Sequence, residues 1–184
     1  MLLTFLISVA LLAAPGAARA SGPVDLSGNP VQLFDTDHSK TTVLIFVRTD
    51  CPISNRYAPE LRRLYEQFSS HVDFYLVYAD RTQTAAAIHR HVTEYGFPFD
   101  ALRDPEHTLV KLAKARVTPE AAVFSARGQL LYHGRIDDRY VDFGKAMPQP
   151  TRRDLEEALR SAVAGKPVTV ASTPAIGCYL ADVP

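Results

Sequence analysis

Three short apolar runs, separated by segments with the spacing of amphipathic helices, constrain the fold of this chain most strongly. The runs are Val43–Val47, Phe74–Tyr78 and Ala121–Phe124. Unbroken apolar runs rich in β-branched and aromatic residues are typical of strands buried on both faces of a sheet. A helix between the first two runs would make them parallel neighbours. The pattern therefore predicts an α/β domain in which helices cover a central sheet.

Two helices are predicted around the second run. From Ser54 to Phe68, apolar side chains recur every three or four residues, so they share one face of a helix. Pro59 lies inside this segment and is expected to bend the helix, because proline has no N–H for the helical hydrogen bond. The other helix is predicted over residues 84–95, with Gly96 at its C-terminal end.

Two further helices are predicted from their end signals. The first covers residues 104–115 and has Pro105 in its first turn, where proline is favoured. The second begins at Thr151, where Asp154 three residues later gives a near match to a capping box, and it ends at Gly165.

The remaining segments predict a mixed sheet and an irregular tail. Ser125–Gly128 has the composition of a turn, so it should join the third apolar run to Gln129–Tyr132 in an antiparallel hairpin. Residues 136–150 show no period and are predicted to form a long loop. We expect one domain over residues 21–165 and a C-terminal tail, residues 166–184, that folds back over the sheet.

The N-terminal segment predicts export. Leu2–Ala14 is an apolar run too short to span a bilayer, and Ala18–Ala20 has the small-x-small form of a signal-peptidase site. We interpret residues 1–20 as a cleaved secretory signal, which would leave a periplasmic or secreted protein without stable membrane association. The segment has no Lys or Arg before the apolar run, so an uncleaved anchor remains the alternative.

Charge argues against nucleic acid as a partner. The chain has 20 Lys and Arg against 20 Asp and Glu, a net charge of zero. Nucleic acid and anionic membranes both require clusters of positive charge. We therefore expect no nucleic-acid partner.

Cys51 is the first candidate for chemistry. It follows the first apolar run and directly precedes a predicted helix. At that junction, unpaired backbone N–H groups and the helix dipole favour the thiolate, which is the reactive form of cysteine. The neighbouring Asp50 opposes this effect, because a nearby anion raises a thiol pKa. The position predicts a nucleophile rather than an inert buried thiol.

The strings Thr49–Glu60, Thr118–Glu120 and Gly134–Tyr140 resemble the secreted redoxins of the alkyl hydroperoxide reductase/thiol-specific antioxidant group. The resemblance implies a thioredoxin-like fold. It also implies that Thr118–Pro119 contains a cis peptide bond, lies against the Cys51 sulfur and binds the backbone of a substrate.

The sequence departs from three motifs of related families. Ser54 stands where a dithiol oxidoreductase has its second cysteine, and Asn55 where a copper-delivery protein has it. A typical peroxiredoxin has proline and threonine where this chain has Leu44 and Arg48, so peroxidase activity would rely on Arg48 and Thr49 as substitute donors. Serine cannot resolve a mixed disulfide, and the local motif supports only monothiol exchange.

Cys178, the second cysteine of the chain, can be interpreted in three ways. As a resolving thiol, it would attack the oxidised or mixed-disulfide form of Cys51. As the partner in a structural disulfide, it would close a loop of 127 residues, worth about 4–5 kcal/mol in the chain-entropy model. As a soft ligand, it would join Cys51 and a histidine to bind Cu(I). Two free thiols remain a fourth outcome.

Other polar residues have ordinary structural interpretations. His89 and His91 are two residues apart on a predicted helix, so they do not face one another and are expected to be solvated. His107 and His133 are candidate third ligands that no spacing selects. The charged run Arg135–Arg139 is expected to be an exposed, mutually paired cluster.

The sequence therefore predicts an exported thioredoxin-like thiol–disulfide oxidoreductase that needs no cofactor. Cys51 is its predicted nucleophile and Cys178 its resolving thiol, and its substrates are thiols or disulfides of proteins or small molecules. The predicted substrate-binding residues are Thr49, Ser54, Asn55, Thr118 and Pro119. The alternatives are a thiol peroxidase acting on peroxide, a copper-handling protein, and a redox-silent binding domain with a structural disulfide.

Overall fold

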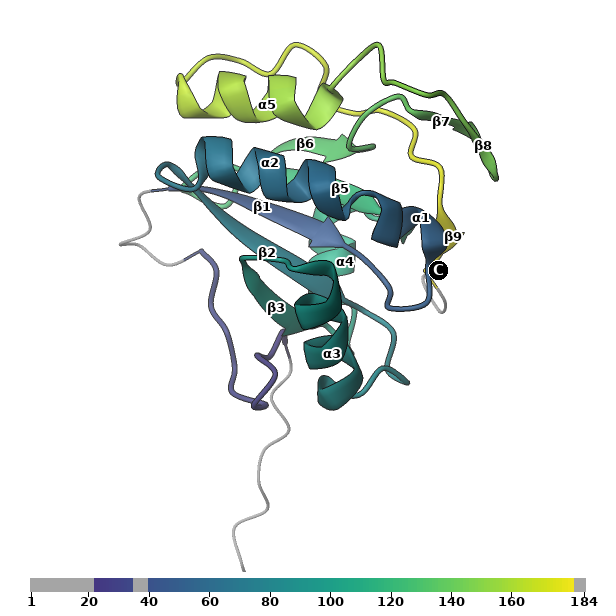
Figure 1. The fold of residues 1–184 in the computed structure, drawn as a ribbon. Helices are drawn as coiled ribbons and strands as arrows, with labels where there is room; N and C mark the ends of the chain where they lie inside the picture. The colour runs from purple at the N-terminus through teal and green to yellow at the C-terminus, as the bar shows by residue number, and fades with distance from the viewer. Residues whose placement is uncertain (1–21, 35–39, 181–184) are drawn as a thin grey trace, which may run out of the picture.

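A mixed five-stranded sheet forms the centre of the protein, as seen in a computed structural model that describes residues 22–34 and 40–180 (Figure 1). The predicted signal, residues 1–20, lies outside the described residues. The strand order is β3-β2-β1-β5-β6, with parallel pairs from β3 to β1 and antiparallel pairs from β1 to β6. The strands are β1 (Thr41–Phe46), β2 (Val72–Tyr78), β3 (Asp100–Arg103), β5 (Glu120–Phe124) and β6 (Leu130–Gly134).

Helices cover both faces of this sheet, as predicted. Side chains of α2 (Ala58–Phe68), α3 (Ala85–Tyr95) and α5 (Asp154–Val163) belong to one core cluster with residues of β1 and β2. Side chains of α4 (Thr108–Ala113) pack on the opposite face together with Leu180 from the tail. The two clusters follow from β1, whose six residues are all buried and alternate between the faces.

The helix predicted over Ser54–Phe68 is divided into two. The first part, α1, spans Pro52–Arg56, and the second begins at Ala58. Tyr57 separates them, and Pro59 stands in the first turn of α2, where its missing N–H costs nothing. The predicted bend is therefore confirmed, and it places Cys51 as the residue that precedes α1.

The residues at the helix ends predict the bounds of α3 correctly but not the start of α4. Gly96 ends α3 with a φ of 62°, as predicted, and Thr84 caps its start by accepting a hydrogen bond from Ala87 N. The helix predicted over 104–115 starts only at Thr108. The reason is Asp104, whose buried carboxylate accepts the N–H groups of Thr108 and Val110 and so fixes the start of α4.

The segment between β6 and α5 is more ordered than predicted. Residues 136–150 contain a hairpin of β7 (Tyr140–Asp142) and β8 (Lys145–Ala146). The helix predicted from Thr151 begins at Asp154 without a side-chain cap. Thr151 instead donates its N–H and hydroxyl to Asp138. Asp154 forms an ion pair with Arg135 at 2.7 Å, so the capping box is not formed.

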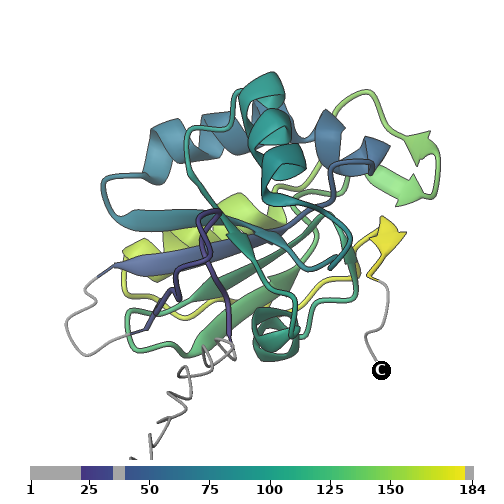
Figure 2. The ribbon, with the colours of Figure 1, turned by 90° about the horizontal axis from the view of Figure 1, so that it is seen from below.

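The described part of the C-terminal tail, residues 166–180, runs back along β6 and reaches α1 (Figures 1 and 2). His133 N donates to Ala171 O at 3.0 Å, and Thr173 N donates to His133 O at 3.2 Å. The tail ends in β9 (Cys178–Tyr179), which pairs antiparallel with β4 (Val117–Thr118). The expected return of the tail over the sheet is confirmed. Within the described ranges, no helix has both the length and the apolar character needed to cross a membrane.

Candidate functional site

Both cysteines meet at one end of the sheet. Cys51 Sγ lies 2.7 Å from Cys178 Sγ, and both are free thiols. Cys51 is 1% exposed, whereas Cys178 is only partly buried. The two sulfurs are therefore in direct contact. Residues 127 positions apart in the chain thus form one candidate redox pair.

Three chain segments build this pair. The β1–α1 junction supplies Cys51, β9 supplies Cys178, and Thr118 at the end of β4 contacts both. The Thr118–Pro119 peptide bond is cis, as predicted. In its thiol form Cys51 donates to Thr118 O at 3.1 Å. Gly177 allows the close approach of β9, because a Cβ at that position would lie 2.2 Å from Thr118 O.

The two cysteines differ in how readily they lose the thiol proton. Burial opposes the Cys51 thiolate, but hydrogen bonds from Cys178, Ser54 and Thr118 outweigh it and lower the pKa of Cys51 below its ordinary value. Burial and the hydrogen bond to Cys51 raise the pKa of Cys178 to about 12. The first proton therefore leaves Cys51, and Cys178 remains its hydrogen-bond donor.

Ser54 and Asn55 were predicted to be polar neighbours of the sulfur. Ser54 fits this role: it is 1% exposed, and its N–H and hydroxyl both lower the pKa of Cys51. Its buried hydroxyl makes no hydrogen bond among the described residues, so it is free to turn towards the Cys51 thiolate, whose pKa it lowers. Asn55 Nδ2 instead donates to Thr49 O at 3.2 Å and so holds the loop before Cys51. No side-chain contact of Thr49 is evident among the described residues, and its binding role remains a prediction.

His91 is the residue that the sequence analysis placed incorrectly. It is 4% exposed rather than solvated. Its Nε2 donates to Asn55 Oδ1 at 2.8 Å, and its Nδ1 accepts from the Tyr78 hydroxyl at 2.7 Å. Burial lowers the pKa of His91, which favours this neutral form. The spacing of three from Ile88, which is also buried, was the available signal that His91 faces inward.

Arg48 forms a second network beside the sulfurs. Its guanidinium binds Asp50 at 3.0 Å and Asp80 at 3.2 Å. The charge of Arg48 lowers the pKa of Cys178 and that of Asp50 raises it, but burial and Cys51 dominate. Arg48 therefore offsets the charge of Asp50, the acidic neighbour of Cys51 in the sequence.

The other predicted ligands lie apart from the cysteines. His107 donates to Ala79 O at 3.1 Å, and His133 Nδ1 lies 3.7 Å from Glu120 Oε1. Within the described residues, no three His, Cys, Asp or Glu side chains gather as a metal site would require. The copper hypothesis remains a prediction.

The charged run Arg135–Arg139 is not wholly exposed as expected. Asp137 is 1% exposed and accepts a hydrogen bond from the Tyr57 hydroxyl at 2.5 Å. Its carboxylate also accepts the N–H of Arg139. Asp137 therefore fastens the segment after β6 to Tyr57, the residue between α1 and α2.

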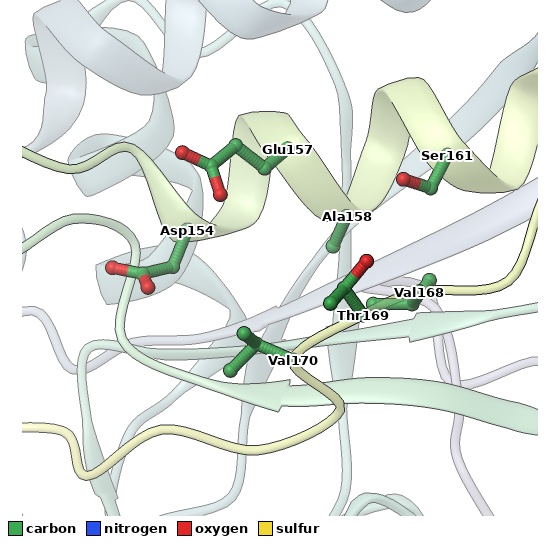
Figure 3. Close-up of a pocket in the computed structure, with 7 residues that line it drawn as sticks. All are labelled: Asp154, Glu157, Ala158, Ser161, Val168, Thr169 and Val170. Atoms are coloured by element: carbon green, nitrogen blue, oxygen red, sulfur yellow. The ribbon is translucent and has the colours of Figure 1, made fainter.

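A small pocket of about 100 Å³ lies between α5 and the returning tail (Figure 3). Asp154 and Glu157 border it on the helix, and Val168–Val170 border it on the tail. None of the predicted site residues lines it. The candidate chemistry is therefore at the cysteine pair and not in this pocket.

Known structures share this architecture. An uncharacterised conserved protein from Geobacillus kaustophilus is 25% identical, with a TM-score of 0.73 over 94% of this chain and 99% of that one. A hypothetical protein from Sinorhizobium meliloti is 24% identical, with a TM-score of 0.73 over 86% and 88%. A secreted disulfide oxidoreductase from Mycobacterium tuberculosis is 22% identical, with a TM-score of 0.51 over 78% and 94%.

These likenesses show a thioredoxin-like fold. Comparison with curated proteins gave no match. The model of the AhpC/TSA family matches residues 13–133, well over half of the chain. The match includes Cys51 and the Thr118–Pro119 loop but ends before Cys178. The chain is therefore a thioredoxin-fold redoxin that belongs to the AhpC/TSA family.

Proposed function

We propose that this redoxin is an exported thiol–disulfide oxidoreductase in which Cys51 is the nucleophile and Cys178 the resolving thiol. The observation that carries the proposal is the contact of the two sulfurs at 2.7 Å, with the pKa of Cys51 lowered and that of Cys178 raised. A thiolate beside a protonated thiol is the arrangement that disulfide exchange requires.

The reaction takes place in two exchange steps. The Cys51 thiolate attacks one sulfur of a substrate disulfide, that S–S bond breaks, and the second substrate sulfur leaves as a thiolate that takes up a proton. Cys178 then loses its proton and attacks Cys51 Sγ, which forms the Cys51–Cys178 bond and releases the first substrate sulfur as a thiol. The substrate disulfide gains two electrons from the two protein thiols, and an external dithiol restores them.

The neighbouring residues have supporting roles in this proposal. Ser54 stabilises the thiolate, since its N–H and hydroxyl lower the pKa of Cys51. The Thr118–Pro119 loop contacts the attacking sulfur through Thr118 O, so it is placed to meet the substrate backbone. Substrates are proteins or small molecules that carry thiols or disulfides. Export is supported by the signal-like pattern of residues 1–20 and by a secreted disulfide oxidoreductase of similar fold.

A redox titration tests the proposal. Free thiols are counted by alkylation and intact mass across graded glutathione and dithiothreitol buffers. We expect a Cys51–Cys178 bond with a midpoint between about −120 and −270 mV, the range of exchange catalysts. Resistance to reduction below about −300 mV would instead identify a structural disulfide. Persistent free thiols would favour the copper-binding alternative, which near-stoichiometric Cu(I) loading would then support.

Activity is tested with single-cysteine variants. Cys51→Ser should abolish disulfide reduction, and Cys178→Ser should accumulate a mixed disulfide on Cys51 that mass spectrometry detects. An active Cys51→Ser variant would overturn the proposal.

A thiol peroxidase is the second candidate, and Arg48 is the observation that favours it. Its guanidinium lies close enough to Cys178 for the charges of the two groups to interact. Peroxide would oxidise Cys51 to a sulfenic acid, and Cys178 would condense with it to a disulfide and water. Peroxide consumption by the reduced protein, compared with that of a free thiol, distinguishes this activity from exchange.

A further inference from the structure

The tail pairs with β4 as the second strand of a two-stranded sheet. Thr118 pairs with Cys178, and Val117 pairs with Tyr179, in antiparallel register. Leu180 N donates to Arg116 O at 3.0 Å, and Thr118 Oγ1 donates to Cys178 O at 3.4 Å. This is strand addition, a common mode of peptide recognition, with the peptide supplied by the chain itself.

The register imposes a strict condition on the residue before the cysteine. A Cβ on Gly177 would lie 2.2 Å from Thr118 O and 2.7 Å from Thr118 C. Both atoms belong to the backbone beside the cis peptide bond, so neither can move aside as a flexible side chain could. Only glycine fits immediately before a cysteine whose sulfur meets Cys51 in this register.

The register also selects the second residue after the cysteine. Leu180 is 7% exposed and packs in the core cluster that contains Leu109 and Phe124. Tyr179, between Leu180 and the cysteine, is 82% exposed and contributes little to the fit. A strand that replaces the tail must fill the position of Leu180 with another apolar side chain, or it leaves a void.

We propose that β4 binds an extended polypeptide substrate with the pattern glycine, cysteine, any residue, apolar residue. We propose further that residues 177–180 are an internal competitor for this site. The proposal rests on the proposed function and specifies its substrate. A substrate strand that pairs with β4 and presents its sulfur to Cys51 must follow the path that the tail now takes. Because β9 is only two residues long, substrate and tail can exchange.

The test uses the full-length Cys178→Ser protein and two synthetic peptides. The first is acetyl-Ala-Ile-Gly-Cys-Tyr-Leu-amide, which copies residues 175–180, and the second has alanine in place of glycine. The cysteine of each carries a thionitrobenzoate disulfide. When the Cys51 thiolate attacks the peptide sulfur, a Cys51–peptide disulfide forms, the old S–S bond breaks and coloured thionitrobenzoate leaves with the electron pair.

We expect the glycine peptide to react at least about tenfold faster than the alanine peptide. This factor corresponds to a difference of 1.4 kcal/mol between the two peptides. Glutathione, a thiol without a docking strand, should react equally with both peptides. Adding Gly177→Ala to Cys178→Ser should speed the reaction with the glycine peptide relative to the reaction with oxidised glutathione in the same protein. The tail can then no longer compete for β4, and the loss of its hydrogen bond to the Cys51 thiolate affects both reactions alike. The matched control is Gly22→Ala, whose Cβ meets nothing within 4 Å and which should leave the rate unchanged.

The outcomes separate this proposal from the proposed function. Equal rates for the two peptides would overturn the glycine rule while leaving exchange by Cys51 intact. Reaction with neither peptide, in protein whose Cys51 is shown to be reduced, would overturn both. An unchanged rate relative to oxidised glutathione in a folded Gly177→Ala variant would overturn the competitor role of the tail. If that variant does not fold, the peptide comparison in Cys178→Ser still decides the glycine rule.

Discussion

The charge state of the Cys51 sulfur depends on a few groups within hydrogen-bonding distance. Burial alone would keep the proton on this thiol, and donors from Cys178, Ser54 and Thr118 reverse that preference. Cys178 comes first among these donors, although it lies in the tail, outside the helix and loop that position Cys51. The pKa of Cys51 is therefore tied to the docking of a segment that the family match does not include.

Removal of the Cys178 thiol should raise the pKa of Cys51. In reduced protein, ultraviolet thiolate absorbance against pH measures this value. We expect a larger rise in Cys178→Ala than in Cys178→Ser, because the serine hydroxyl still donates a hydrogen bond to the thiolate. An unchanged pKa in Cys178→Ala would contradict the assignment of Cys178 as the donor.

His91 should make stability depend on pH. Burial lowers its pKa in the folded state below the ordinary value of 6.5. The unfolded chain therefore takes up a proton before the folded protein does, and the free energy of unfolding falls as pH decreases below about 6.5. Denaturant unfolding at a series of pH values measures this slope.

Variants of the two neighbouring histidines separate this effect from other titrations. His91→Gln should reduce the slope and, at neutral pH, lower the free energy of unfolding by about 1–3 kcal/mol if Tyr78 or Asn55 loses its partner. His89→Gln, at an exposed position of the same helix, should leave both quantities unchanged. Equal slopes in wild type and His91→Gln would contradict the buried neutral histidine.

The start of α4 depends on a single carboxylate. Asp104 is fully buried and accepts hydrogen bonds from Thr108 N at 2.8 Å and Val110 N at 2.9 Å. We expect Asp104→Ala to lower the free energy of unfolding by about 1–3 kcal/mol, because two buried N–H groups lose their acceptor. Asp104→Asn, which retains one carbonyl oxygen, should lose less.

Chemical denaturation compares these variants with Glu106→Ala. Glu106 forms only an exposed ion pair with Arg81 at 3.5 Å, and such pairs contribute little to stability. A loss in Asp104→Ala no larger than that in Glu106→Ala would show that the carboxylate does not fix the helix start.

Elements with a local signal were predictable, and those held by distant partners were not. The apolar runs of β1, β2 and β5 and the ends of α3 were visible in the sequence. The edge strand β3 was missed because its four residues include Asp100 and Arg103 and form no apolar run. The start of α5 was misplaced because Asp138, from the preceding segment, takes the hydrogen bonds of Thr151.

The same distinction applies to the candidate site. Cys51 and Thr118–Pro119 could be found from their neighbours in the chain and from the family resemblance. Cys178 was predicted as the partner of Cys51 because it is the second cysteine of the chain, although the contact spans 127 positions and leaves no local pattern. This contact depends on two glycines that let the tail approach closely. A Cβ on Gly134 would lie 2.3 Å from Thr173 O, and a Cβ on Gly177 would lie 2.2 Å from Thr118 O.

Across the whole molecule, the tail connects the last helix to the end of the sheet where the two cysteines meet. It leaves α5, runs along β6 and delivers Cys178 to Cys51 (Figures 1 and 2). Oxidation of the pair would close a loop that contains most of the sheet. The redox state of the cysteines is therefore coupled to the stability of the whole fold.

Oxidised wild type should unfold at a higher temperature than the reduced protein. Closure of this 127-residue loop is worth up to about 4–5 kcal/mol in the chain-entropy model. For a protein of this size, that corresponds to a rise on the order of 10 °C in Tm. Calorimetry of oxidised and reduced samples measures the rise, and alkylation shows which state each sample holds.

Cys51→Ser and Cys178→Ser are the controls, because neither can form the disulfide. For each variant, Tm should be the same under oxidising and reducing conditions. By linkage, whatever free energy the bond adds to the fold also makes the bond harder to reduce, by about 30 mV for every 1.4 kcal/mol. A rise in Tm near the full value of the loop-closure term would thus indicate a structural disulfide. A rise in Tm of only a few degrees would indicate an exchange catalyst. No rise at all, in a sample shown to be oxidised, would mean that the bond does not constrain the unfolded chain as the loop predicts.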